Sequence, residues 1–138
     1  MRIMAIDYGD AHTGIAISDP TGFLAGFTTT INAYRPEVVA DQVASLAREH
    51  GVEELVLGYP KNMDGSVGPR AEKAQAMGEL LKDVTGLPLT LWDERRTTID
   101  AHQILMGAGK NAKKRKKTVD AVAATLILEG YLTYKKSR

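Results

Sequence analysis

The chain has 138 residues, of which 43% are hydrophobic and 25% are charged. This length and composition predict one ordinary globular domain over residues 1–138. Because the chain contains no cysteine, disulfides and thiolate metal sites are excluded, which suits a reducing compartment. We find neither a signal peptide nor an apolar run close to the roughly 18 residues that cross a bilayer, so we expect a cytoplasmic protein with no membrane partner.

The net charge of +1 hides a strong asymmetry along the chain. Residues 1–94 carry 7 Lys and Arg against 14 Asp and Glu, a net charge of −7, whereas residues 95–138 carry 11 against 3, a net charge of +8. A basic segment of this kind suggests a polyanionic partner, because lysine and arginine gain affinity by displacing counterions from phosphates. A solvated basic tail is the alternative interpretation.

The first part of the chain predicts an antiparallel meander of three strands. Stretches rich in apolar, β-branched or aromatic residues lie at 2–8, 12–19 and 23–30. Gly9 and residues 20–22 supply the turns between them.

From Pro36 onward the apolar pattern predicts helices that alternate with strands. In chain order we first expect a helix from Pro36 that ends at Gly51, a strand at 55–57 and a loop at 61–69. A helix from Pro69 to Gly86 and a strand at 87–92 should follow. The chain should then form a short helix at 98–106 and a final helix from Thr118 to about Tyr134. The final helix should bury Val122, Leu126 and Leu132. This order predicts an α/β fold, with a mixed five-stranded sheet and helices on both faces.

Acidic residues end two of the predicted strands. Asp7 follows the first strand, and Asp93 and Glu94 follow the last one. Ligands of open α/β sheets lie outside the carboxyl ends of the strands, so these acids are candidate site residues. A plain turn at Asp7 and a solvated strand end at Asp93 are the structural alternatives. Asp120 lies in the first turn of the predicted final helix, where the helix dipole alone would favour an anion.

Acids from three segments, in a chain without cysteine and with only three histidines, match a site for a hard cation. We therefore expect one or two ions of Mg²⁺ or Mn²⁺. Two such ions about 4 Å apart stabilise both the attacking and the leaving oxygen in phosphodiester cleavage.

Six of the eight residues from 110 to 117 are Lys or Arg, directly before the helix that carries Asp120. Such a run attracts phosphates without reading base identity. It contains no aromatic residue, so the run gives no support for base stacking, and we expect Trp92 in the core. The candidate nucleic-acid-binding residues of this run are Lys113, Lys114, Arg115, Lys116 and Lys117.

Four motifs in order form one series along nearly the whole chain. They are Ile6-Asp7-Tyr8-Gly9 with Gly14-Ile15-Ala16, Leu57-Gly58-Tyr59-Pro60 with Asp64-Gly65-Ser66, Asp93-Glu94-Arg95-Arg96-Thr97-Thr98, and Lys117 with Asp120-Ala121-Val122-Ala123-Ala124. This series closely resembles the YqgF (RuvX) family, whose members are described as pre-16S rRNA nucleases and as Holliday-junction resolvase-like proteins.

The resemblance implies a ribonuclease H-like fold and hydrolysis of phosphodiester bonds, most of all in 5′-end processing of pre-16S rRNA. It implies the catalytic and metal-binding set Asp7, Glu94 and Asp120, with Asp93 in support. Arg95 and Lys117 would then steady phosphate charge, and Lys61 and Arg70 would reach the substrate; for Lys61 and Arg70 a plain surface charge is the alternative interpretation. Some wider relatives place an acid at the end of the fourth strand, where this chain has Gly58-Tyr59-Pro60.

Three alternatives stay open at this point. The chain could be a resolvase-like nuclease of branched DNA, which would need two active sites and therefore a homodimer. It could bind RNA or a ribosome precursor without catalysis, with the acids structural. It could also transfer phosphate, since an Asp-x-Gly after a first strand resembles the phosphate loop of sugar kinases; those enzymes use two domains, which this length does not favour.

Overall fold

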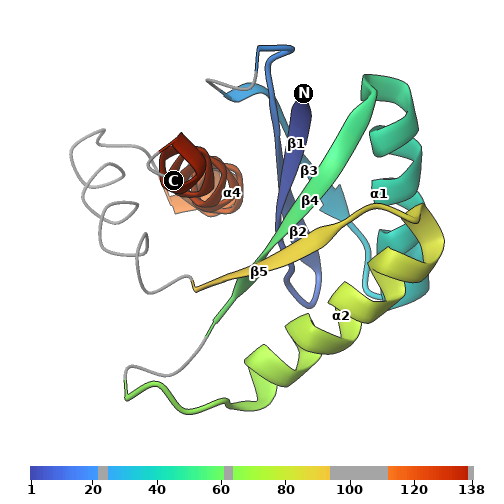
Figure 1. Ribbon diagram of the computed structural model, residues 1–138. Helices are drawn as coiled ribbons and strands as arrows, with labels where there is room; N and C mark the ends of the chain where they lie inside the picture. The colour runs from blue at the N-terminus through green and yellow to red at the C-terminus, as the bar shows by residue number, and fades with distance from the viewer. Residues whose placement is uncertain (22–24, 61–63, 94–111, 137–138) are drawn as a thin grey trace.

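The computed structural model describes residues 1–21, 25–60, 64–93 and 112–136, with the side chains of the last segment described from Val122 to Lys135. A five-stranded sheet with the strand order β3-β2-β1-β4-β5 forms its centre (Figure 1). The strands are β1 (Arg2–Asp7), β2 (His12–Ser18), β3 (Ala25–Asn32), β4 (Val52–Tyr59) and β5 (Leu89–Asp93). The described helices are α1 (Pro36–His50), α2 (Pro69–Thr85) and α4 (Ala112–Lys136).

The sheet is mixed, as the sequence predicts. β1, β2 and β3 pair antiparallel, whereas β1 pairs parallel with β4, and β4 parallel with β5. The strand predicted at 55–57 is longer than expected, because the backbone of β4 pairs from Val52 to Tyr59 with strands on both sides. The short helix predicted at 98–106 lies outside the described residues.

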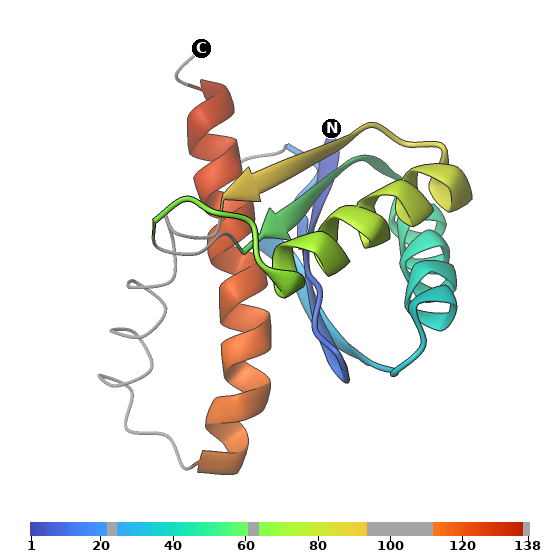
Figure 2. The same cartoon turned by 90° about the horizontal axis from the view of Figure 1, so that it is seen from below.

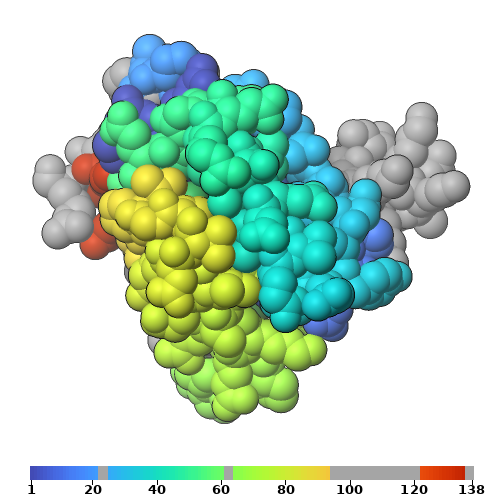
Figure 3. Space-filling model, turned by 90° about the vertical axis from the view of Figure 1, so that its right-hand side faces the viewer, coloured from blue at the N-terminus to red at the C-terminus, as the bar shows by residue number. Residues whose placement is uncertain are grey.

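α1 and α2 cover one face of the sheet and lie side by side on it (Figure 3). Each begins with a proline at its first turn and ends at a glycine in the left-handed conformation, Gly51 with φ 66° and Gly86 with φ 69°. One face of α1 packs on the sheet: Val39, Val43 and Ala47 are buried there, and the partly buried Leu46 packs against the same core.

α4 crosses the opposite face of the sheet (Figures 1 and 2). The buried residues of this second core are Ile3, Ala5, Ala16, Val56, Trp92, Ala124, Ile127, Leu128, Tyr131 and Leu132. Trp92 is 7% exposed, which confirms that it belongs to the core. The predicted buried positions Val122 and Leu126 are only half-buried, while Leu132 is buried as expected.

The predicted start of the final helix is wrong. α4 begins at Ala112, two turns before Thr118, because the Ala, Lys and Arg residues of the basic run are strong helix formers. Residues 112–117 of the basic run are therefore part of α4 instead of preceding it, and Asp120 lies in the third turn. The dipole of the helix N-terminus, which acts within the first turn, consequently does not account for an acid at position 120.

A buried carboxylate fixes the end of α4 to the sheet. Glu54 of β4 is 8% exposed and accepts hydrogen bonds from the Tyr131 hydroxyl and, at 2.8 Å, from the Lys135 Nζ. The Tyr131 hydroxyl also lies 3.4 Å from the Thr90 Oγ1 on β5. Since a buried carboxylate is costly without partners, these bonds select one position of α4 on the sheet. No helix within the described ranges is both long and apolar enough to span a membrane.

We expect Tyr131→Phe to lower the free energy of unfolding by about 1–3 kcal/mol, because it leaves a buried oxygen of Glu54 without its donor. Denaturant unfolding would measure the change. Tyr134→Phe is the matched control, since the Tyr134 side chain is 42% exposed, and it should stay within about 0.5 kcal/mol of the parent. Equal losses in both variants would contradict the anchoring role of Tyr131.

The same residue predicts a loss of stability at alkaline pH. Burial and then the hydrogen bond to Glu54 raise the pKa of Tyr131 above its ordinary value of 10.0. The unfolded chain therefore loses this proton first, so the contribution of Tyr131 is complete below pH 10 and is lost as the pH rises above it. Unfolding measured between pH 8 and pH 11 should show a shallower alkaline decline in Tyr131→Phe than in the parent.

Candidate functional site

The parallel strands β1, β4 and β5 end at one edge of the sheet, which we call the carboxyl edge. Ile6 pairs with Leu57, and Leu57 pairs with Leu91, so Asp7 lies level with Trp92 and one residue short of Asp93. β4 separates the other two strands, which puts the backbones at Asp7 and at the end of β5 about 10 Å apart. Side chains from these two strand ends are long enough to approach one another across that distance.

Asp7 faces the side of the sheet that α4 crosses. Alternate residues of a strand face the same side of the sheet, so Ile3, Ala5 and Asp7 share one side. Ile3 and Ala5 both pack in the core beneath α4. Asp7 is half-buried, at the point where this core opens to solvent. The structure thus places the first predicted acid at the carboxyl edge on the α4 side.

The turn after Asp7 requires glycine. A Cβ built on Gly9 would lie 2.3 Å from the carbonyl oxygen of His12, a contact that no side chain can make. The Gly9 N–H also points to the Oγ1 of the buried Thr13, at 3.5 Å. The tight return of β1 into β2 therefore holds the end of β1, with Asp7 on it, in place.

Asp93, the last residue of β5, lies on a side of the sheet that its neighbours on the strand define. Thr90 and Trp92 face α4, while Leu89 and Leu91 contact Gly78 of α2 from the other side. Asp93 therefore shares the α2 side, opposite to Asp7. Glu94 and Arg95 lie outside the described residues, so their predicted roles stay predictions.

Asp120 belongs to α4, one helical turn before Ala124, which packs on the sheet. α4 itself lies on the side of the sheet that Asp7 faces. The side chains of Asp120 and of the basic residues Lys113, Lys114, Arg115, Lys116 and Lys117 are outside the description. Among the described residues, no three His, Asp or Glu side chains form a metal-binding group.

The remaining predicted residues are divided between α2 and the undescribed loop. Arg70 is exposed in the first turn of α2, at the carboxyl edge. Lys61 lies outside the described residues. As the sequence indicates, β4 ends in Gly58 and Tyr59 and carries no acid at this edge.

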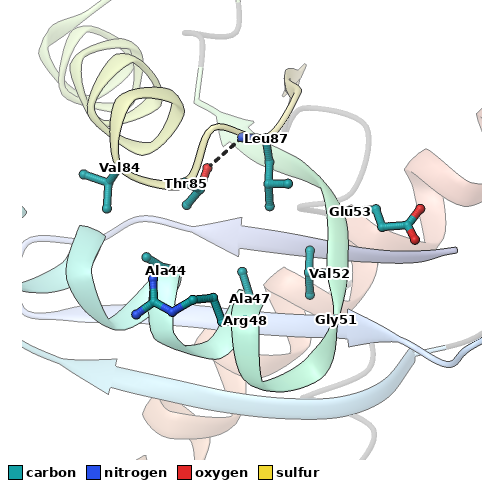
Figure 4. A pocket seen from close by; sticks show the side chains of 9 residues that line it. All are labelled: Ala44, Ala47, Arg48, Gly51, Val52, Glu53, Val84, Thr85 and Leu87. Atoms are coloured by element: carbon teal, nitrogen blue, oxygen red, sulfur yellow. Dashed lines mark hydrogen bonds between the residues drawn. The ribbon is translucent and has the colours of Figure 1, made fainter.

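Two cavities lie between α1 and α2, at opposite ends of these helices. The larger, about 390 Å³, is formed where both helices end, with Arg48 and Glu53 as its charged lining (Figure 4). Its position at the amino ends of the parallel strands separates it from Asp7. The smaller, about 340 Å³, lies at the carboxyl edge and is lined by Tyr8 and Tyr34 among others. Sequence reasoning missed this second cavity, because its tyrosines are 26 positions apart and share no motif.

The fold is ribonuclease H-like, of the kind found in RuvC-type resolvases. Thermus thermophilus RuvC, solved in complex with a Holliday junction substrate, matches with a TM-score of 0.65 and 11% identity over 99% of this chain and 96% of that chain. At this identity the likeness concerns the fold alone.

The sequence identifies the family. A family model described as RuvX, Holliday junction resolvase, matches residues 1–134. A relative from Halothermothrix orenii, named "Putative pre-16S rRNA nuclease", is 45% identical over 134 residues, which are 97% of this chain and 96% of that protein. The chain belongs to the RuvX family. It is a nuclease, a hydrolase that acts on ester bonds.

The kinase alternative is not supported. The ROK hexokinase from Thermus thermophilus matches with a TM-score of 0.50 and 21% identity, over 68% of this chain but only 35% of the hexokinase. The likeness thus extends to a shared core and leaves most of the kinase without a counterpart here.

We expect Gly9→Ala to reduce catalysis more than its stability cost explains, because its Cβ would displace the turn that holds Asp7. The added methyl should cost about 1–3 kcal/mol in overpacking. Gly51→Ala is the control: it is strained by φ 66° but has open space around it, so it should cost about 1–2 kcal/mol and keep full activity per folded molecule. Equal specific activities of the two variants would refute the role of the turn.

Proposed function

We propose that this protein is a divalent-metal-dependent endonuclease that processes the 5′ end of pre-16S rRNA. The observation that carries the proposal is the position of Asp7, half-buried at the carboxyl edge on the side that the Asp120-bearing helix crosses. The printed name of the Halothermothrix orenii relative supports the choice of substrate. This substrate implies action in the cytoplasm, with residues 1–138 working as one domain.

The proposed metal ligands are Asp7, Glu94 and Asp120. Their oxygen donors fit a hard cation, so Mg²⁺ or Mn²⁺, as one or two ions, is the expected cofactor. When bound, such a cation supplies Lewis-acid stabilisation of the charge that develops on the phosphate. Glu94 is preferred over Asp93 as a direct ligand, since Asp93 lies on the α2 side of the sheet, opposite to Asp7. Asp93 would then support the set from the α2 side.

The chain's own cations would hold the substrate. Arg70 at the carboxyl edge, together with Lys61 and Arg95, is proposed to contact phosphates next to the site. The proposed phosphate-binding residues on the first turns of α4 are Lys113, Lys114, Arg115, Lys116 and Lys117. In Figure 2 these turns extend past the sheet. Contacts of this kind position a backbone and do not select bases.

Branched DNA is the second candidate substrate. The description of the matched family model as a Holliday junction resolvase favours it. Symmetric cleavage of a junction needs two active sites, so this function requires a homodimer. A monomeric protein that cuts precursor rRNA would exclude it.

We expect Asp7→Asn to lower the rate of precursor rRNA cleavage by more than about 100-fold, since even the outer partners of metal ligands typically contribute about 10- to 100-fold. Asp41→Asn is the matched control, because Asp41 is exposed on α1 and should leave cleavage unchanged. The substrates are a 5′-extended 16S rRNA fragment and a four-way DNA junction, each with Mg²⁺ or Mn²⁺. If the parent cleaves neither, a binding role without catalysis replaces the nuclease proposal.

Metal binding has a readout that does not depend on cleavage. Millimolar Mn²⁺ should raise the thermal midpoint of the parent and of Asp41→Asn, because a ligand that binds the folded state stabilises it. The rise should be absent in Asp7→Asn. An equal rise in all three proteins would show that Asp7 is not a ligand.

A further inference from the structure

The cavity of about 340 Å³ at the carboxyl edge belongs to none of the roles assigned above. It lies on the α1 and α2 side of the sheet, whereas Asp7 faces α4. Its lining includes Tyr8 from the end of β1, Tyr34 from the segment before α1, and Lys73, Met77 and Leu80 from α2. Since Tyr8 directly follows Asp7, the cavity opens at the same edge as the acids, one residue away along β1.

The chemistry of the cavity is that of a site for a flat, apolar ring. The buried Met77 and the partly buried Leu80 and Tyr8 give it an apolar lining. Tyr34 on its rim is 81% exposed, which is unusually high for an aromatic side chain. Its volume is at the lower end of the about 300–1,000 Å³ typical of ligand sites, enough for one ring system.

Charges at the rim complement a phosphate attached to such a ring. The Lys73 Nζ lies 3.1 Å from the Asp10 Oδ1, and both side chains are largely exposed, so this ion pair is weak and readily exchanged for a phosphate. Arg70 lies three residues before Lys73 and is therefore its neighbour on the helix surface.

We propose that this cavity binds one unstacked nucleobase of a single-stranded substrate, next to the phosphate that is cleaved, with Tyr8 and Tyr34 supplying the stacking surfaces and Lys73 a phosphate contact. The inference rests on the proposed nuclease function and adds that the substrate is single-stranded at this point. Stacking on aromatic side chains tolerates any base, so the cavity would recognise an unpaired nucleotide and not a sequence.

The test uses proteins that also carry Asp7→Asn, so that the probe is not cut. The probe is a fluorescent single-stranded RNA of precursor sequence, and dissociation constants are measured at one fixed salt concentration. Tyr34→Ala should weaken binding about 5- to 10-fold, at the lower end of the stacking range because the ring is exposed. Tyr8→Leu should weaken it similarly, whereas Tyr8→Phe should bind as the parent does. Phe27→Ala, an exposed aromatic on β3, is the control and should change nothing.

A series of strands with a single abasic nucleotide makes the test specific for a base. For one abasic strand of the series, the affinity of the parent should fall to the affinity that Tyr34→Ala has for the intact strand. On that same abasic strand, the Tyr34→Ala substitution should cause no further loss of affinity. Lys73→Gln should instead weaken intact and abasic strands equally. If Tyr34→Ala binds the intact strand as tightly as the parent, or loses affinity equally on every abasic strand, the inference is overturned. Because Tyr34 is so exposed, a folding defect cannot imitate these results.

The nuclease proposal and this inference can fail separately. Base-dependent binding by a parent protein that cleaves no substrate would keep the cavity as a base site and reject the nuclease. Cleavage by the parent together with unchanged binding by the tyrosine variants would keep the nuclease and reject the base site.

Discussion

The packing of α4 across one face of the sheet is the interaction on which the proposed site depends. Asp7 is fixed to that face by its place in β1, and the backbone at Asp120 is on the same side of the sheet because α4 lies there. The apolar stripe of α4 supplies the driving force, and Glu54 adds direction, since its buried carboxylate is satisfied only when Tyr131 and Lys135 meet it. Removal of one partner would leave a buried charge, so a shifted helix is strongly disfavoured.

The parallel pairing of β1, β4 and β5 divides the carboxyl edge into two sides with different chemistry. Along β1, Asp7 faces α4 and Tyr8 faces α1 and α2, because neighbouring residues of a strand point to opposite faces. An acidic site and an aromatic cavity are thus one residue apart in sequence and separated by the thickness of the sheet. A strand that passes over this edge would meet both, which links cleavage at a phosphate with recognition of a neighbouring base.

Much of this arrangement follows from local signals in the sequence. Gly51, Pro69 and Gly86 mark helix ends by their backbone geometry, and the acid after the first strand is visible without a structure. The sequence misplaces the start of α4 because Thr118 has the chemistry of a cap, whereas the helix-forming residues of the basic run before it already belong to the helix from Ala112. The Glu54 anchor and the tyrosine cavity were missed because their members are distant in sequence and only the fold brings them together.

The earlier start of α4 changes how the basic run relates to the acids. Within a helix, positions three, four and seven residues before Asp120 share its side, and these are Lys117, Lys116 and Lys113. A helix that carries like charges three and four residues apart is weakened by their repulsion. Phosphates bound along these turns would remove that repulsion, so substrate binding would stabilise the part of α4 that leads to Asp120. Attraction of the substrate and placement of an acid would thereby be coupled through one helix.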